Sequence, residues 1–191
     1  MTDQLILHGM GSPNVTKVVI MLEECGLDYE LRHVAVFGQE QFSPAFLALN
    51  PLGKVPVLED PRLGIPLAES GAILHYLAER EGKFLPAAQP ATQAARAEVM
   101  QWLMVQMANI GPMLGQVNHF RLVMKSGTHP YAEGRYVAAA EEHGGKVIAA
   151  PVRNPPPEWP HSTTFVIPCW ARNQATARLV SRFTRSISPS L

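Results

Sequence analysis

The first part of the chain alternates between short apolar runs and amphipathic stretches. An apolar run at Leu5–Leu7 is followed by a glycine-rich turn, and from Val15 onward apolar residues recur at i, i+3, i+4 and i+7. This pattern predicts a buried strand and then an amphipathic helix. Ser12 is expected as the N-cap of that helix, with Pro13 in its first turn and Gly26 just beyond its end.

A second strand, a helical stretch and a hairpin follow. Residues 29–36 alternate in part between polar and apolar side chains, which predicts a strand, and residues 39–50 predict a helical stretch that Pro44 interrupts. Apolar runs at 55–58 and 65–68 flank turn residues, as in a β-hairpin. The order strand, helix, strand and hairpin favours an α/β domain with a βαβ start.

From residue 70 onward the pattern is helical. Ser70 is expected to cap a helix with an apolar stripe, and apolar positions keep a helical period between 90 and 110. Gly111–Pro112 predicts a kink or a break, and a further helix is expected from about 131 to 150. The pattern therefore predicts an α/β domain followed by a helical one.

Composition narrows the possible partners. The 191 residues are 47% hydrophobic, which allows a packed core, and 16 basic side chains balance 16 acidic ones. This balance creates no field that would draw the chain to nucleic acid or to an anionic membrane. The apolar runs are too short for a membrane span or a signal peptide. We therefore expect a cytoplasmic protein without a nucleic-acid or membrane partner.

Cysteine and histidine spacing argues against two kinds of site. Cys25 and Cys169 are too far apart for a C-x-x-C motif, a zinc knuckle or a disulfide framework. The histidines show no metal-ligand spacing, so no metal is expected. Any thiol chemistry is expected to use a thiol that another molecule supplies.

The last part of the chain differs in composition from the rest. Residues 1–150 hold eleven basic and fifteen acidic side chains, whereas residues 151–191 hold five arginines, one acid and seven of the 17 prolines. Many prolines without apolar periodicity predict a poorly packed or disordered tail.

Two helix starts carry polar residues that suit an anion. The unpaired N–H groups and partial positive charge of a helix N-terminus stabilise an anion, which makes Ser12–Asn14 a candidate site. At the next helix start, Ser70 and the adjacent N–H groups can hold a carboxylate while Glu69 takes an ammonium, as the head of an amino acid requires. Simple helix capping is the alternative that the sequence leaves open at both places.

A third loop, Asn50–Pro56, ends in a proline just inside a predicted strand. If the Val55–Pro56 bond is cis, the backbone edge of Val55 turns outward and can hydrogen-bond an extended peptide by strand addition. An edge-strand proline that prevents aggregation is the alternative. Together the three loops describe a slot for a small anionic peptide.

Four segments stand in the order and spacing of one known family: Ser12–Lys17, Met21–Leu27, Asn50–Pro56 and Glu69–Leu74. On these motifs the chain from Leu5 to about Arg135 resembles the glutathione transferase superfamily. Three further segments are similar to its bacterial Nu class, of disulfide-bond-reductase type: Gln101–Leu103, Ile110–Gln116 and Tyr131–Tyr136. The resemblance implies a thioredoxin-like, glutathione-binding α/β domain over residues 1–83 and a partial all-helical domain over 84–150. The tail over 151–191 departs from the family.

The resemblance also implies how glutathione, as cosubstrate, is held. The backbone of Val55, ahead of a cis Pro56, would pair with the cysteinyl unit. Glu69 and Ser70 would bind the γ-glutamyl end. Two further side chains would lie toward the glycyl carboxylate: Lys54 and Gln41.

The sulfur of glutathione would face the first helix. The resemblance implies that Asn14 and Ser12 contact the sulfur and that Arg135 approaches it. A free thiol has a pKa of about 8.5, so ionising it at neutral pH requires about 2.7 kcal/mol, which one or two hydrogen bonds of about 1.5–3 kcal/mol to the thiolate supply. The thiolate would then attack a disulfide or an electrophilic small molecule.

Two interpretations of function remain open. The first is a homodimeric disulfide-bond reductase or S-transferase that takes glutathione and a small electrophile or disulfide. The second is a catalytically silent binding or regulatory module of the same fold. The second follows from the tail, because a truncated helical domain would leave Trp102 and its neighbours partly uncovered.

Overall fold

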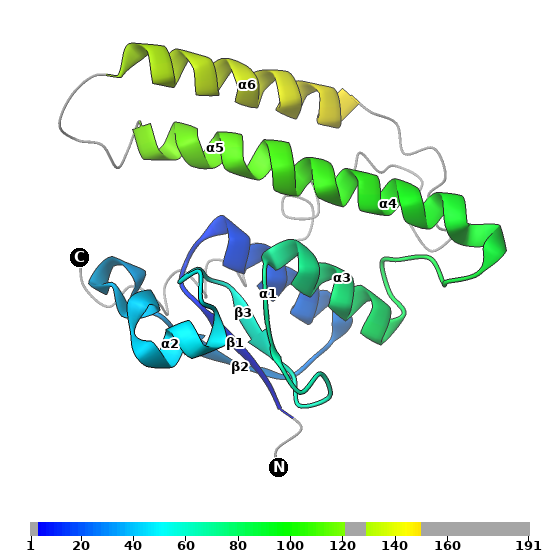
Figure 1. The fold of residues 1–191 in the computed structure, drawn as a ribbon. Coiled ribbons are helices and arrows are strands. Elements are labelled where there is room, and N and C mark those ends of the chain that lie inside the picture. The colour runs from blue at the N-terminus through cyan, green and yellow to red at the C-terminus, as the bar shows by residue number, and fades with distance from the viewer. Residues whose placement is uncertain (1–3, 121–128, 150–191) are drawn as a thin grey trace. The chain divides into compact units, whose positions relative to one another are not determined.

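The described residues form two compact units (Figure 1). The computed structural model describes residues 4–120 and 129–149, with side chains as far as Glu142. One unit ends at Leu85 and the other begins at Pro86. The predictions for the tail over 151–191, and for Cys169, lie outside the described residues.

The first unit is built on a mixed four-stranded sheet with the order β2-β1-β3-β4 (Figure 1). Its strands are β1 (Leu5–Gly9), β2 (Tyr29–His33), β3 (Val57–Glu59) and β4 (Pro66–Ala68). β1 pairs in parallel with β2, and β3 pairs antiparallel with both β1 and β4. The predicted α/β class, with its βαβ start and hairpin, is therefore confirmed.

Helix α1 (Pro13–Cys25) has the predicted ends. The Val15 N–H donates to the Ser12 hydroxyl oxygen, and Pro13 occupies the first turn. Gly26 ends the helix in the left-handed conformation, at φ 72°, and its N–H donates to the Glu23 carbonyl. Local capping residues were sufficient to predict this helix.

The segment between β2 and β3 corrects one prediction and confirms another. The second strand ends at His33 instead of continuing to residue 36. The helical stretch is broken at Pro44, as predicted: a 3₁₀ turn ends at Phe42 and Pro44 begins a new helix, because the first helical position needs no N–H and Ser43 before it accepts a hydrogen bond from the Phe46 N–H. The elements of this segment are two 3₁₀ turns and one helix: η1 (Val36–Gly38), η2 (Glu40–Phe42) and α2 (Pro44–Leu49).

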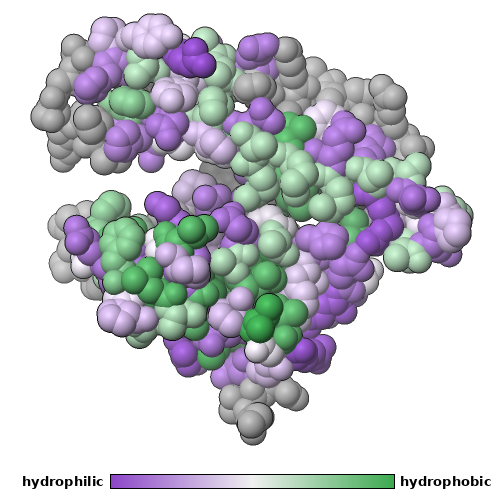
Figure 2. All heavy atoms as spheres, in the orientation of Figure 1, coloured by the Kyte–Doolittle hydropathy of each residue, from purple (hydrophilic) through white to green (hydrophobic). Residues whose placement is uncertain are grey.

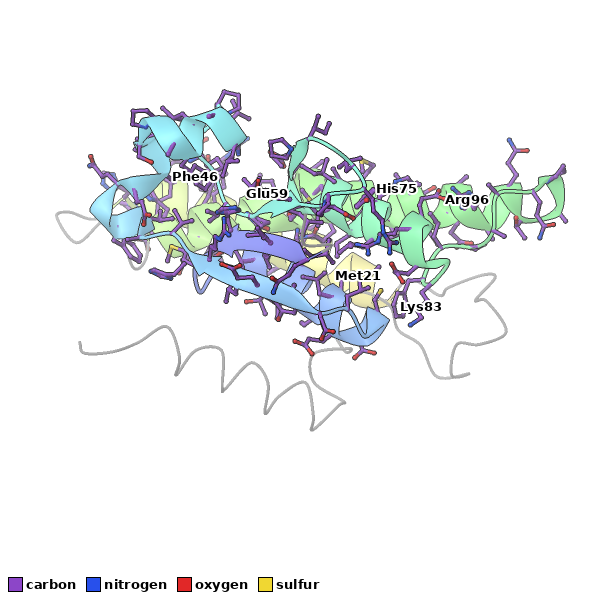
Figure 3. The ribbon with its side chains drawn as sticks, turned by 90° about the horizontal axis from the view of Figure 1, so that it is seen from below. Met21, Phe46, Glu59, His75, Lys83 and Arg96 are labelled. Atoms are coloured by element: carbon purple, nitrogen blue, oxygen red, sulfur yellow. The ribbon has the colours of Figure 1, made fainter. Side chains whose placement is uncertain are left out.

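Phe46 packs α2 against one face of the sheet (Figure 3). Its buried ring packs with Val34 and Val57 and meets the His8 ring edge to face, with 6.3 Å between ring centroids. Because neighbouring strand residues point to opposite faces, Leu7 and Leu58 point away from α2. Both are fully buried.

Helix α3 (Ser70–Glu81) lies beside α1 (Figure 1). The fully buried side chains of the two helices are Val15, Val18, Leu22, Ile73 and Leu77. The predicted capping by Ser70 is wrong: Glu69 is the N-cap and Ser70 is the first helical residue. The chain enters α3 with a positive φ at Glu69, a feature that a polarity pattern does not reveal.

A buried carboxylate ties the β3–β4 turn to α3. Asp60 is 4% exposed, and its Oδ2 accepts hydrogen bonds from the Tyr76 hydroxyl at 2.6 Å and from Arg80 Nη1 at 2.8 Å. Oδ1 accepts from the Arg62 N–H at 2.9 Å. Burial, followed by the hydrogen bond to Asp60, raises the pKa of Tyr76 to about 12. The cluster therefore holds Tyr76 in its neutral, donating form.

Replacing Tyr76 by phenylalanine should lower the free energy of unfolding by about 1.5–3 kcal/mol, since a donor to a charged, buried acceptor is lost. Denaturant unfolding measures this change. Tyr29→Phe is the matched control: its hydroxyl donates to Glu23, an exposed carboxylate, so a loss of at most about 1 kcal/mol is expected. Equal losses in the two variants would contradict a special role for the Asp60 cluster.

The effect of Tyr76→Phe on stability should depend on pH. The pKa of Tyr76 is raised in the folded state, so the native protein holds this proton above pH 10, where the unfolded chain releases it. The contribution of Tyr76 to stability is therefore complete below about pH 10 and falls as pH rises toward about 12. The stability difference between wild type and Tyr76→Phe should shrink over this range.

The second unit is helical, as predicted. Helix α4 (Gln93–Val105) runs into the π-helical turn η4 (Gln106–Ile110) and then into α5 (Gly111–Asn118), and α6 (Pro130–Ala149) lies beside α5 (Figure 1). Of the kink or break predicted at Gly111–Pro112, a break is absent because the chain stays helical. A π-helical turn directly precedes Gly111–Pro112, since Pro112 has no N–H for the carbonyl four residues earlier. Trp102 is partly exposed. A 3₁₀ turn, η3 (Pro90–Thr92), precedes α4.

Within the ranges that the structure describes, no helix combines the length and the apolar character needed to cross a membrane.

Candidate functional site

The strand register brings the three predicted loops to one end of the sheet. His8, near the end of β1, pairs with Val57, the first residue of β3. Val57 also pairs with Ala68, the last residue of β4. Three segments adjoin these strand ends and therefore share that end of the first unit: Ser12–Asn14, Val55–Pro56 and Glu69–Ser70.

The first segment combines a cap with an open amide. The Ser12 hydroxyl oxygen accepts from the Val15 N–H at 3.4 Å, and the Ser12 carbonyl accepts from the Thr16 hydroxyl at 2.9 Å. Ser12 therefore caps α1, which is the alternative that the sequence left open. Asn14 is exposed on the first turn of α1, and its side chain makes no hydrogen bond with any described residue. Its N–H₂ group is open to a ligand at a helix N-terminus, where an anion is favoured.

The second segment exposes a backbone edge. The Val55–Pro56 peptide bond is cis, as the strand-addition hypothesis supposed. The Val55 side chain packs against the cluster of Val34, Phe46 and Val57, while its N–H and C=O form no hydrogen bond within the described part of the chain. An unpaired donor and acceptor on one residue next to a strand can pair with an extended peptide.

Gln41 lies next to this loop. Gly53, at φ 59°, packs so closely that an added Cβ would lie 3.1 Å from the Gln41 carbonyl oxygen and 2.8 Å from the Phe42 ring. The Gln41 side chain is 7% exposed, and its Oε1 has no hydrogen-bond partner among the described residues. A buried amide oxygen without a partner is costly, so a ligand donor at this point would stabilise the loop. Lys54 is exposed beside it.

The third segment is strained. Glu69 has φ 68° and ψ 113°, a conformation that non-glycine residues rarely adopt and that costs about 1–3 kcal/mol. Its side chain is exposed, whereas Ser70 is 3% exposed. Such strain is common where a side chain must be held toward a ligand. The geometry leaves the Glu69 carboxylate open to a cation.

Lys17, which lies near Glu69, was not predicted as a site residue. Burial lowers the pKa of the Lys17 ammonium to about 8, and the carboxylate of Glu69 opposes this change. At neutral pH Lys17 is therefore still charged. Lys17 lies one turn after Asn14 on α1, and this spacing was the signal in the sequence that could have identified it. Spacing does not predict that its side chain is buried.

Asn50 was also missed as an individual residue. It is 3% exposed, and its side chain hydrogen-bonds within the loop that ends at Pro56. The Asn-Pro-Leu-Gly sequence is typical of a turn and was the signal for it.

Two residues named in the sequence analysis lie outside these three segments: Arg135 and Cys25. Arg135 is exposed on α6, in the second unit, and its position is described only within that unit. Cys25 is buried at the end of α1, where burial raises the pKa of its thiol and Lys83 partly offsets this. A buried thiol of raised pKa is a poor nucleophile. No group of three or more metal-ligating side chains occurs in residues 4–120 and 129–142.

Sequence and structure comparisons give relatives for this arrangement. Residues 4–79 match the model of the glutathione S-transferase N-terminal domain. The disulfide-bond oxidoreductase YfcG of Escherichia coli (strain K12) is 43% identical over 135 residues, which cover 68% of this chain and 60% of that protein.

Two solved structures share the fold. A glutathione transferase from Pseudomonas putida, with one glutathione disulfide bound per subunit, is 42% identical with a TM-score of 0.68 over 75% of this chain and 63% of that one. A glutathione transferase homologue from Lodderomyces elongisporus, with two GSH per subunit, is 32% identical with a TM-score of 0.70 over 76% of this chain and 69% of that one.

The fold and the site define a thioredoxin-like α/β protein with a helical second part. The chain belongs to the glutathione transferase family, and the resemblance to its disulfide-bond-reductase type is confirmed. The chain spans 60% of the length of YfcG.

Proposed function

We propose that this protein is a glutathione-dependent enzyme. The thiolate of bound glutathione attacks a disulfide or an electrophilic small molecule, so that the protein acts as a disulfide-bond reductase or an S-transferase. Glutathione is the cosubstrate, and no metal takes part. The relatives support this proposal, since YfcG is named a disulfide-bond oxidoreductase and the Pseudomonas putida enzyme holds glutathione disulfide.

The observation that carries the proposal is the unpaired N–H and C=O of Val55 between two polar helix starts. In the proposed complex, the cysteinyl unit of glutathione forms an antiparallel pair with Val55, next to cis Pro56. A tripeptide held through its backbone keeps its side chain, the thiol, out of the hydrogen-bonded plane and available for reaction. The adjoining α1 N-terminus then receives the sulfur.

The two ends of glutathione have complementary partners. We assign the γ-glutamyl ammonium to the exposed Glu69 carboxylate and the γ-glutamyl carboxylate to Ser70 and the N–H groups at the start of α3. The glycyl carboxylate is assigned to Lys54 and to the amide of Gln41. The oxygen and nitrogen of a glutamine amide exchange places by rotation, so Gln41 can present N–H₂ where its oxygen now lacks a partner.

The sulfur is assigned to Asn14 and Ser12, and the role of Arg135 stays a prediction from the resemblance. Asn14 donates to the thiolate and cannot itself lose a proton, so a proton-abstracting base is unnecessary. In reduction, the thiolate attacks one sulfur of a disulfide, forms a mixed disulfide and releases a thiolate that takes up a proton. A second glutathione then resolves the mixed disulfide. In conjugation, the same thiolate displaces a leaving group from carbon.

The proposal also covers the domain organisation, the location and the oligomeric state of the protein. We propose a glutathione-binding domain over residues 1–83, a partial helical domain over 84–150 and a cytoplasmic homodimer. Apolar side chains reach the surface of the first unit (Figure 2), and the large exposed ones include Phe37, Phe42 and Leu52. Apolar surface of this kind is what a partner subunit covers.

The alternative is a binding or regulatory module without turnover. It is supported by the composition of residues 151–191, which departs from the family, and by the partly exposed Trp102. In this alternative the chain binds glutathione but does not turn over a second substrate.

Calorimetry with reduced glutathione and steady-state assays distinguish the enzyme from the silent module. We expect a heat of binding, and turnover of a small disulfide or an aryl halide in the presence of glutathione. Binding without either activity would favour the silent module. A folded sample, with native circular dichroism, that shows neither binding nor turnover would refute the proposal.

A further inference from the structure

Asn50 closes the turn between α2 and β3 through four hydrogen bonds. Its Nδ2 donates to the Lys54 carbonyl at 2.8 Å, and its Oδ1 accepts from the Leu52 N–H at 3.1 Å. Its backbone N–H donates to the Phe46 carbonyl at 2.9 Å, and its carbonyl accepts from the Gly53 N–H at 3.0 Å. The buried Asn50 side chain thus uses both of its polar atoms inside this one turn.

The bond to Lys54 determines the direction of the next N–H. The Lys54 carbonyl and the Val55 N–H belong to one planar peptide unit, and in a trans unit they point in opposite directions. Among the described residues the cis bond joins Val55 to Pro56, so the Lys54–Val55 peptide unit is trans. Because Asn50 draws the Lys54 carbonyl inward, the Val55 N–H must point away from Asn50.

Two neighbours make this turn rigid. Gly53 has φ 59°, and an added Cβ there would collide with the Phe42 ring, so the turn and η2 pack without spare room. The Val55 side chain is anchored beside Phe46 and Val57. With both flanks held by packing, the Asn50 amide is the polar contact that sets the rotation of the Lys54–Val55 peptide unit.

We propose that Asn50 is a positioning residue: it preorganises the Val55 backbone edge to receive the peptide ligand. This inference rests on the proposed glutathione site but adds a residue that never touches the ligand. A preorganised donor loses less entropy on binding, so the effect falls on affinity rather than on the chemical step. A purely structural Asn50 would affect stability alone.

The test compares Asn50→Ala with Ser43→Ala. Ser43→Ala removes the cap of α2, a hydrogen bond to the Phe46 N–H, and leaves the 50–55 turn untouched. Both variants lose stability. Asn50→Ala should raise the Kd and KM for glutathione about tenfold with kcat nearly unchanged, as loss of preorganisation implies, whereas Ser43→Ala should leave the Kd unchanged.

A third variant isolates the Lys54 contact. In Asn50→Asp the acceptor for Leu52 remains, but an ionised carboxylate cannot donate to the Lys54 carbonyl, whereas a protonated one can. Relative to wild type at each pH, the affinity of this variant for glutathione should recover as pH falls. An affinity ratio that does not vary with pH would contradict the role of the Lys54 contact.

Amide hydrogen exchange and NMR shifts, measured without ligand, make the inference independent of glutathione. Asn50→Ala should lower the protection of the Leu52 N–H and shift the Val55 amide resonance, and Ser43→Ala should do neither. Unchanged Val55 and Leu52 signals in a folded Asn50→Ala protein would overturn the inference. If wild type does not bind glutathione while these signals change as expected, the proposed function fails and the positioning role of Asn50 stands.

Discussion

Replacing Asn14 by alanine is expected to lower kcat about 10- to 150-fold while the affinity for glutathione changes little. A hydrogen bond to a charged acceptor contributes about 1.5–3 kcal/mol, and Asn14 is assigned to the thiolate, not to the rest of the peptide. The pKa of the bound thiol should rise by about one to two units in the variant. Steady-state kinetics at saturating glutathione and the ultraviolet absorbance of the thiolate against pH measure the two effects.

Thr16→Val is the matched control for Asn14→Ala. It removes a hydrogen bond in the same helical turn, from the Thr16 hydroxyl to the Ser12 carbonyl, without removing a donor assigned to the sulfur. We expect kcat to stay within about threefold of wild type in this control. If Asn14→Ala abolishes glutathione binding and leaves the rate per bound ligand unchanged, Asn14 is a binding residue and the assignment is wrong.

Glu69→Gln is expected to raise the Kd for glutathione about 10- to 100-fold. The substitution keeps the size of the side chain but removes the charge assigned to the γ-glutamyl ammonium, a charge-assisted contact. Calorimetry at pH 7 is the appropriate measurement, because the pKa of Lys17 is about 8 and its ammonium stays protonated there. Measurements above pH 8 would mix two charge changes.

A glutathione analogue without the α-amino group tests whether the ammonium is the partner. Wild type should bind this analogue weakly, and Glu69→Gln should weaken its binding no further. Glu79→Gln is the matched control, since it removes one negative charge from the exposed end of the same helix, beside His75. A loss of affinity for glutathione in Glu79→Gln as large as in Glu69→Gln would point to net charge and against a specific contact.

The local signals in the sequence were enough for most of the first unit. Ser12, Pro13 and Gly26 define the ends of α1 because capping depends only on residues within one turn. The same reasoning failed at Ser70. There the outcome depended on how the chain enters the helix, and at Glu69 the chain enters with a positive φ that only the surrounding fold imposes.

The candidate site likewise combines features that the sequence predicted with features that it did not. Its three segments were predicted because each has its own turn or cap signal, and the strand register then brought them to one end of the sheet. The roles of Asn50 and Lys17 were not predicted. Asn50 acts through a hydrogen bond to a carbonyl four residues away, and the pKa of Lys17 depends on burial by residues remote in sequence.

By itself, the sequence determined which segments become strands and helices, the two-part α/β and helical organisation, and the set of polar residues available to a small anionic peptide. Those properties follow from periodicity and capping, which act over a few residues. The tertiary structure alone decided that the Val55 backbone is left unpaired, that Glu69 is strained and open, and that Asp60 and Asn50 are buried with all their partners in place. Burial and hydrogen-bond pairing are properties of neighbours in space, and the chain acquires those neighbours only when it folds.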